Sequence, residues 1–226
     1  MIKDRKAAFL PPIFLLSEGI LYYFILTASG RVLMYTSFLS VVLCFAFALL
    51  CSDKSSILTV FALACTVGAD FFLVLQTPAE RIWGMVFFLV AQTLYAVKLH
   101  LCTGNKPILF VRILLTVLAE AVALIVLGSR LDALAAISMC YYANLLINII
   151  EGFTVFSKNR LFPIGLLLFI LCDTVIGLQV AASGYLPIGP NSLLHKIIFM
   201  DFNLSWFFYL PSQVLISMST LPRSNQ

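Results

Sequence analysis

The sequence contains eight apolar runs, each long enough to form a helix that crosses a lipid bilayer. A crossing helix needs about 20 predominantly apolar residues in succession. By that measure we predict spans at about 7–27, 32–51, 56–76, 82–101, 108–128, 131–151, 161–182 and 197–219. The breaks between the runs are short and carry the Gly, Pro, Ser and charged residues typical of loops. We therefore expect one all-α, polytopic membrane domain over residues 1–226, in which successive helices are antiparallel neighbours.

The composition indicates the same class of protein. Hydrophobic residues make up 62% of the chain and charged residues only 11%, whereas a soluble domain carries about 25% charged residues. No cluster of Lys and Arg with interleaved aromatic residues occurs, so we expect no nucleic-acid partner. The six cysteines lie within or at the ends of apolar runs and form no CxxC pair. This placement favours small core residues over disulfide bonds.

The distribution of Lys and Arg predicts the orientation in the membrane. If the N-terminus is cytoplasmic, the inside segments hold ten of the 14 Lys and Arg residues and the outside loops hold four. Cytoplasmic loops of membrane proteins carry an excess of these residues. We therefore expect both termini to be cytoplasmic, in a bacterial cell membrane or a eukaryotic endomembrane.

Two aspartates stand deep inside predicted spans. Asp70 lies in CTVGADFFLVLQ (65–76) and Asp173 lies in CDTVIGLQ (172–179), and each follows a small residue and precedes a Gln by six positions. A carboxylate at the bilayer centre costs at least about 2.5–3.5 kcal/mol, so such groups face protein or a wet cavity and are usually functional. The following spans also match, with Gln92 aligned to Gln213, which suggests two parallel four-helix repeats.

Other polar side chains are expected near the depth of the two aspartates. Tyr141, Asn144, Asn148 and Glu151 recur at three, four and three residues and form one stripe on a helix. Polar side chains within spans also bridge helices, and we favour that role for Glu120. The candidates for orienting substrate or water are Gln92, Tyr95, Asn144, Asn148, Tyr209 and Gln213, and the candidate supporting residues are Glu18, Tyr22, Thr66, Tyr141 and Glu151.

The two carboxylates predict acid–base chemistry. The only histidines, His100 and His195, fall near opposite faces of the membrane, so they cannot join in a three-His zinc site. No GxSxG motif is present either, and we expect neither a metal nor an organic cofactor. Two carboxyls in a low-dielectric cavity do not both stay ionised, so one holds its proton while the other serves as base or stabiliser. That arrangement suits hydrolysis of an acid-labile substrate.

Several motifs resemble one family of membrane enzymes. Asp70 in VGADFFLVL, followed by WGMVFF (83–88) and AQTLY (91–95), is similar to the YhhN-like lysoplasmalogenase family. In the second half, Asp173 in LLFILCDTVIGLQ and the stretch FYLPSQVLI (208–216) fit the same family. The chain departs from the family's pattern at two places, with Ala69 where Gly is usual and Gln92 where His is usual.

The resemblance implies an eight-span hydrolase that cleaves the vinyl ether bond of lysoplasmalogens, giving a fatty aldehyde and a glycerophospho-alcohol. Asp70 and Asp173 are the expected catalytic residues. The expected partners are a lysophospholipid substrate and membrane lipids, and the oligomeric state stays open. Two alternatives also stay open. One is a small transporter or lipid carrier that binds a proton or cation at the Asp pair, although no Gly- or Pro-broken helix is expected at either Asp. The other is an inactive lipid-binding relative, because of Gln92.

Overall fold

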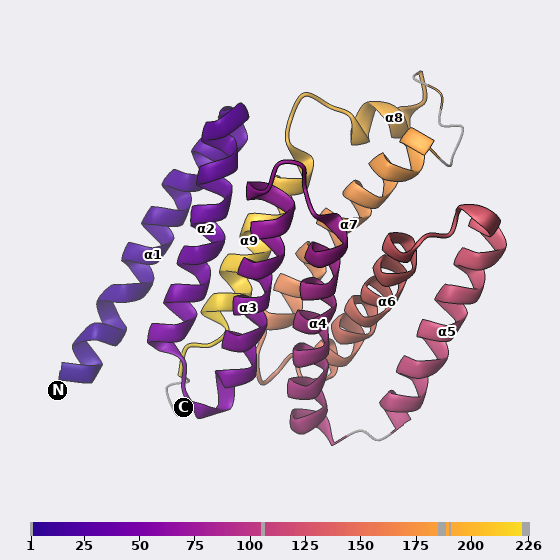
Figure 1. The fold of residues 1–226 in the computed structure, drawn as a ribbon. Helices are drawn as coiled ribbons and strands as arrows, with labels where there is room; N and C mark the ends of the chain where they lie inside the picture. Colours follow the sequence, from indigo (N-terminus) through magenta and orange to yellow (C-terminus); the bar gives the residue numbers. More distant parts are fainter. Residues whose placement is uncertain (1, 105–106, 185–188, 190, 223–226) are drawn as a thin grey trace.

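The apolar runs fold as helices. The computed structural model describes residues 2–104, 107–184, 189 and 191–222, and the regular elements in these ranges are all helical (Figure 1). The α-helices are α1 (Ile2–Thr27), α2 (Gly30–Cys51), α3 (Ile57–Asp70), α4 (Arg81–Thr103), α5 (Pro107–Leu127), α6 (Ala133–Thr154), α7 (Leu161–Gly184), α8 (Leu193–Ile198) and α9 (Leu204–Met218). Two 3-10 turns, η1 (Lys54–Ser56) and η3 (Gly128–Arg130), and one π-helical segment, η2 (Phe71–Leu75), complete the description.

Seven helices among the described residues are long and apolar enough to cross a membrane, and they match the first seven predicted spans within a few residues. The chain is therefore a multi-pass membrane protein. The eighth predicted span, 197–219, is not confirmed. Its first residues belong to α8 and the following loop, and α9 begins only at Leu204, where the Asn203 side chain caps the helix. Fifteen residues rise only about 22 Å, which is less than the bilayer core of about 30 Å.

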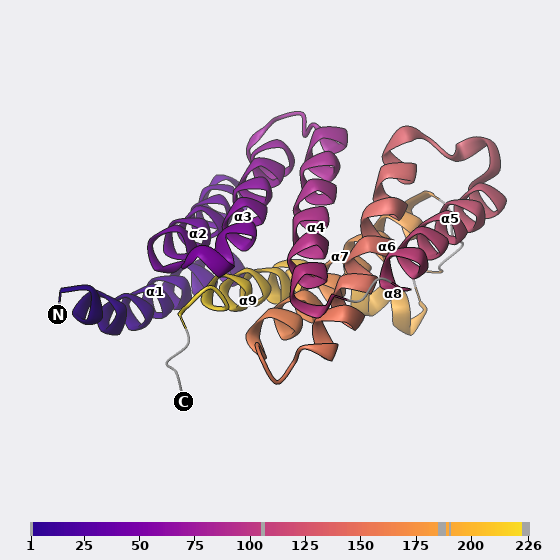
Figure 2. The same ribbon diagram turned by 90° about the horizontal axis from the view of Figure 1, so that it is seen from below.

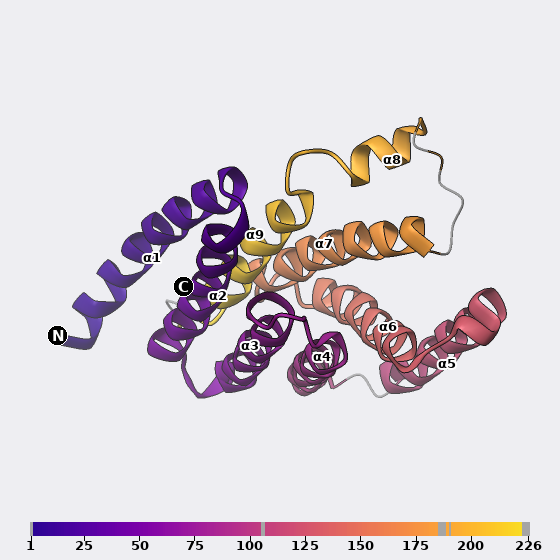
Figure 3. The ribbon, with the colours of Figure 1, turned by 45° about the horizontal axis from the view of Figure 1, so that its top comes forward.

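Six of the helices pack into a closed ring. The ring runs α2, α3, α4, α6, α7, α9 and back to α2, each helix packing against the next. Helix α1 lies outside it against α2 and α9, whereas α5 lies at the opposite end against α6 (Figures 1 and 3). The largest cluster of buried apolar side chains draws members from all six ring helices, so the core fills the centre of the ring.

Glycines bring the two Asp-bearing helices close to their neighbours. A Cβ on Gly165 of α7 would lie 2.7 Å from Ile216 Cγ1 of α9, and a Cβ on Gly68 of α3 would lie 2.9 Å from the Phe87 ring of α4. Real Cβ atoms do not approach this closely, so only Gly permits these contacts. Figure 2 shows α3 and α4 side by side, and α7 packs against α9. Asp70 and Asp173 are thus carried by two tightly packed helix pairs.

Candidate functional site

Asp70 ends an α-helix inside the protein. It is the last residue of α3 and only 3% exposed. The Tyr209 hydroxyl of α9 donates a hydrogen bond of 2.6 Å to Asp70 Oδ2. Immediately after Asp70 the chain changes to the π-helical segment η2, in which the Gln76 amide donates to the Phe71 carbonyl. Such π turns are rare in proteins, but those that occur are often found at functional sites. The sequence of this segment did not predict one.

Asp173 lies in the middle of α7 and is held from α6. The Tyr141 hydroxyl donates a hydrogen bond to Asp173 Oδ2. The residues that follow Tyr141 and Asp173 also form a hydrogen bond, with the Tyr142 and Thr174 hydroxyls 2.8 Å apart. Each aspartate is therefore paired with a tyrosine from a neighbouring helix, Asp70 with α9 and Asp173 with α6.

The two Asp–Tyr pairs form a single site. Tyr209 of the first pair and Tyr141 of the second pack against the same two rings, those of Phe88 and Phe169. Cys172, which precedes Asp173 in α7, is buried in the same cluster as Tyr141 and Tyr209. The structure therefore brings together the two groups that the sequence singled out from segments about a hundred residues apart.

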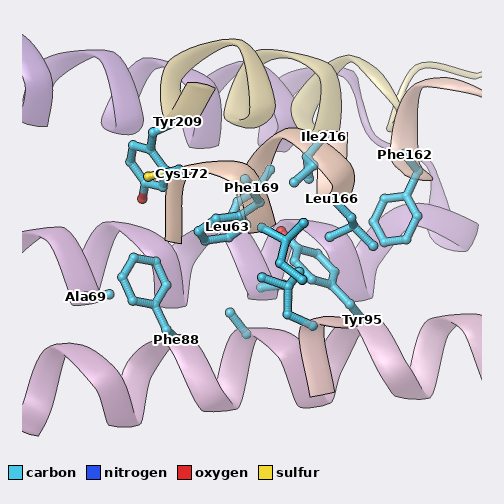
Figure 4. Close-up of a cluster of buried hydrophobic side chains, with 14 of the residues drawn as sticks. Leu63, Ala69, Phe88, Tyr95, Phe162, Leu166, Phe169, Cys172, Tyr209 and Ile216 are labelled. Carbon is cyan, nitrogen blue, oxygen red and sulfur yellow. The ribbon is translucent and has the colours of Figure 1, made fainter. Parts of the chain in front are cut away.

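Aromatic rings surround the two tyrosines. Both Tyr141 and Tyr209 pack against Phe88 of α4 and Phe169 of α7, with ring centroids between 5.4 and 6.4 Å apart. Figure 4 shows Tyr209, Phe169 and Phe88 grouped at one end of the apolar cluster, beside Cys172. Neither phenylalanine could be singled out from the sequence, because an aromatic residue in an apolar run carries no signal of its own. The site thus combines two carboxyls, two phenol donors and a largely apolar surround, which equips it for proton transfer rather than for holding a highly charged group.

Thr66 lies one helical turn before Asp70 in α3, whereas Tyr95 belongs to α4 and Gln213 to α9. Thr66, Tyr95 and Gln213 are all fully buried. Thr66 donates to a carbonyl of its own helix, that of Ala62. In contrast, neither amide atom of Gln213 has a hydrogen-bond partner in the part of the chain that the structure describes.

Gln92 and Asn148 are paired with each other instead of with an aspartate. Asn148 Nδ2 donates to Gln92 Oε1 at 2.9 Å and to the Gln92 main-chain carbonyl at 2.8 Å. This contact joins α4 to α6. Within the described ranges, Gln92 Nε2 and Asn148 Oδ1 have no partner.

Asn144 and Glu151 belong to a second cluster, built around Arg112 of α5. Arg112 Nη2 lies 3.1 Å from Glu151 Oε2, and Nη1 donates to Asn144 Oδ1 at 3.0 Å. Thr103 Oγ1 also donates to Glu151, at 2.9 Å. This cluster borders a cavity of about 230 Å³ between α4, α5 and α6. From the sequence, Arg112 contributed only to the count of Lys and Arg residues that predicts the membrane orientation. However, a charged residue inside an apolar run is the same signal that identified Asp70.

The remaining candidates fasten the outer helices to the ring. Ser40 Oγ of α2 donates to Glu18 Oε2 at 2.6 Å, and the Tyr22 hydroxyl of α1 donates to the Phe207 carbonyl at 3.0 Å. Glu120 of α5 accepts a hydrogen bond from Cys140 Sγ of α6 at 3.1 Å, as expected for a helix-bridging side chain. The structure therefore places Glu18 and Tyr22 at the contacts of α1, away from the Asp pair.

The predicted four-helix repeat is not confirmed. The helices α3 and α4 pack together, as do α7 and α9, but the two aspartates are held differently. The alignment of Gln92 with Gln213 puts Phe88 at the place of Tyr209, so the first half offers no matching hydroxyl on α4. Asp173 is held instead by Tyr141 of α6. The likeness between the Asp segments thus does not extend to their partners.

Comparison with known proteins finds one family. A model described as the YhhN family matches residues 31–220. This range includes nearly all of α2 and the whole of α3 to α9, and therefore both Asp–Tyr pairs, while α1 lies outside it. No curated protein and no solved structure matches the chain.

Proposed function

Because the chain belongs to the YhhN family, we propose that it is a lysoplasmalogenase-like hydrolase. Its substrate is a lysoplasmalogen, and its products are a fatty aldehyde and a glycerophospho-alcohol. The YhhN family includes lysoplasmalogenases. The single observation that carries the proposal is the placement of Asp70 and Asp173 inside a membrane bundle, each hydrogen-bonded to a tyrosine that packs against the same two phenylalanine rings.

The chemistry needs one acid, one base and one water. The protonated carboxyl gives its proton to the outer carbon of the enol ether, and the adjacent carbon becomes an oxocarbenium ion. The ionised carboxylate stabilises that cation and then takes a proton from the water that adds to it. The resulting hemiacetal passes its hydroxyl proton to the ether oxygen as the carbon–oxygen bond breaks, which releases the aldehyde and the alcohol. The two carboxyls have then exchanged roles, and one proton transfer between them restores the starting state.

The tyrosines position the two carboxyls. Tyr209 and Tyr141 donate to Asp70 and Asp173, which leaves the second oxygen of each carboxyl for substrate or water. A hydrogen bond to a charged group is worth about 1.5–3 kcal/mol. We therefore expect Tyr209→Phe to lower kcat/KM by about ten- to 150-fold, since each 1.36 kcal/mol is a factor of ten in rate. A wild-type rate in this variant would exclude a role for the hydrogen bond to Asp70.

The defining test is aldehyde release from lysoplasmenylethanolamine by purified protein in detergent. Wild type should release aldehyde, and Asp70→Asn and Asp173→Asn should each lose at least about 100-fold, the typical contribution of a general acid or base. The matched control is Asp132→Asn, which makes the same change at an exposed helix cap. Asn caps a helix as well as Asp does, so this variant should keep full activity. Full activity in either site variant, with the fold retained, would refute the mechanism.

Gln92 offers a second test of the same chemistry. The YhhN-like family usually has His at this position, whereas the amide of Gln92 is engaged by Asn148 and cannot transfer a proton. In this chain the proposed proton transfers therefore rest on the carboxyls alone. If a histidine here assists proton transfer, Gln92→His should raise kcat and move its pH optimum. An unchanged profile would show that this position contributes packing only.

We also propose that both ends of the chain lie in the cytoplasm. The start of α1 and the end of α9 lie at the same end of the bundle (Figure 1), and the excess of Lys and Arg favours that end as the inside. The membrane is a bacterial cell membrane or a eukaryotic endomembrane. Reporter domains fused to each terminus test the orientation, and an extracytoplasmic signal from either fusion would contradict it.

A carrier is the second candidate function. The observation that favours it is the π-helical segment directly after Asp70, because interrupted helices commonly form the ion and substrate sites of transporters. The detergent assay separates the two functions. An enzyme releases aldehyde without a gradient, whereas a carrier needs two compartments and shows no turnover in micelles.

A further inference from the structure

Two buried polar side chains, Thr66 and Gln213, lie one helical turn from the Asp70–Tyr209 pair, one on each of its two helices. Thr66 precedes Asp70 by four residues in α3, and Gln213 follows Tyr209 by four residues in α9. Residues four apart share a face of a helix. Because α3 and α9 run in opposite directions (Figure 1), both steps lead toward the end of the bundle that holds the start of α1. Each step is about 6 Å, so Thr66 and Gln213 lie at one level.

Tyr95 reaches the same level from α4. Its side chain extends into the middle of the buried cluster (Figure 4), close to the Thr66 hydroxyl. Its ring packs against Phe162, with centroids 5.2 Å apart. The Tyr95 hydroxyl therefore lies in the same layer as Thr66, inside the ring of helices.

Lys98 continues this series toward the same end of the bundle. It follows Tyr95 by three residues in α4, and its Nζ donates to Thr59 Oγ1 at 2.7 Å while lying 3.9 Å from the centre of the Phe162 ring. Thr59 is fully buried and lies two turns before Thr66 in α3. We use the term polar column for the set that leads up to Asp70, which is Thr59, Lys98, Tyr95, Thr66 and Gln213.

The upper part of the polar column carries unmatched hydrogen-bonding capacity. The Gln213 amide atoms Nε2 and Oε1 are without partners among residues 2–104, 107–184, 189 and 191–222, although the side chain is 0% exposed. The nearby Tyr95 hydroxyl lies against the Thr66 hydroxyl. Burying a polar atom unpaired is unfavourable, and such atoms in native proteins are usually bound to ordered water. Leu would fill the same space without that cost. The polar atoms therefore indicate a polar ligand that is small enough for a packed core.

We propose that the polar column conducts water between the Thr59–Lys98 end of the bundle and the Asp70 carboxyl. This inference rests on hydrolysis as the proposed function, because each turnover consumes one water at a site otherwise enclosed by apolar side chains. Tyr95 and Gln213 act as positioning residues. They hold the water through hydrogen bonds and do not touch the reacting atoms themselves.

Access of water to the column is tested without any substrate. Gln213→Cys and Ile216→Cys place a thiol at two fully buried positions of the same helix, and the reaction of the native cysteines is subtracted with the unsubstituted protein. The probe is a small water-soluble methanethiosulfonate. A thiol reacts as its thiolate, which forms only where water reaches it, so Gln213→Cys should react at least about tenfold faster than Ile216→Cys. Equal rates at the two positions would overturn the proposal.

The catalytic role of the column is tested by nearly isosteric removal of its polar atoms. Tyr95→Phe and Gln213→Leu should each lower kcat for aldehyde release by at least about tenfold, since a misplaced reactant costs up to about 100-fold. KM and the thermal midpoint should stay close to those of wild type, because neither change alters a contact to the lipid or creates a cavity. The control is Tyr23→Phe, which removes the same hydroxyl from a side chain that is 65% exposed. Wild-type kcat in both column variants would overturn the catalytic role.

The two experiments separate this inference from the function on which it rests. A wild-type protein that releases no aldehyde would refute the hydrolase, and the labelling rates at positions 213 and 216 would still decide whether water enters the column. An active wild type with equal labelling rates would refute the column and leave the hydrolase standing.

Discussion

Breaking the ion pair between Arg112 and Glu151 should destabilise the protein strongly. The Arg112 side chain is 13% exposed and that of Glu151 is 1% exposed, so removal of one partner leaves the other charge buried. In Arg112→Met the Glu151 carboxylate loses its ion pair and keeps the hydrogen bond from Thr103. Orphaning a buried charge in this way costs about 3–5 kcal/mol. Glu151→Met should cost a similar amount, because the guanidinium then keeps its hydrogen bonds to the two Asn144 carbonyl groups but loses its charged partner.

The double variant, with Arg112→Met and Glu151→Met together, should behave differently. It removes the desolvation of both charges and leaves two flexible apolar side chains beside a cavity with mostly apolar walls. Replacing a whole buried pair by apolar residues is often neutral or stabilising. We therefore expect the double variant to have a free energy of unfolding close to that of wild type. Its destabilisation should be much smaller than the sum of the two single effects.

The measurement is reversible chemical unfolding of the protein in detergent, with the two single variants, the double variant and wild type compared as a cycle. The control is Arg31→Met, which removes an exposed Arg at the start of α2 and should change the free energy of unfolding by no more than about 0.5 kcal/mol. The reasoning would be refuted if the double variant were destabilised by the sum of the single effects. That result would mean that the two charges do not compensate each other.

Two further predictions concern the packing and the loops. Gly165→Ala should destabilise the protein by about 1–3 kcal/mol, because its Cβ would lie 2.7 Å from Ile216 Cγ1. Gly177→Ala in the same helix meets nothing within 4 Å and should be neutral or stabilising within about 1 kcal/mol. Equal effects of the two changes in chemical unfolding would contradict the close contact of α7 with α9. In the loop before η1, the hydrogen bond from the Ser55 hydroxyl holds the pKa of Asp53 below its ordinary value. The Asp53 carboxylate therefore contributes its full stability above the pKa that it has in the unfolded chain. This contribution is lost as the pH falls through its lower pKa in the folded protein. Asp53→Ala should cost at most about 1 kcal/mol at neutral pH, and the difference from wild type should vanish in acid.

The apolar runs determined the spans that the structure confirms. Whether a segment can cross a bilayer depends on the length and composition of that segment alone, and seven of the eight predicted spans appear at nearly the expected residues. The depth of a residue is also local, because it follows from the rise along its own helix. This is why Asp70 and Asp173 could be singled out, and why Tyr141 and Tyr209 were among the candidates before their partners were known.

The eighth span shows the limit of this reasoning. An apolar stretch from 197 onward predicts a long helix, but the cap at Asn203 divides it, so α8 and α9 are separate. The π-helical segment after Asp70 is a similar case. Both depend on which hydrogen bonds the backbone and caps make, and hydropathy does not report them.

Tertiary structure alone decided which polar residues meet. Residues at one depth can face any neighbour, because the rotation of each helix is set by packing across the interfaces, such as the contact at Gly165. The stripe of α6 was predicted as one face, yet its members diverge, with Tyr141 bound to Asp173 and Asn148 bound to Gln92. Asn144 and Glu151 turn instead to Arg112, outside the ring. Sequence placed the polar groups in a layer, and helix packing sorted that layer into an Asp–Tyr site and the contacts that hold the bundle around it.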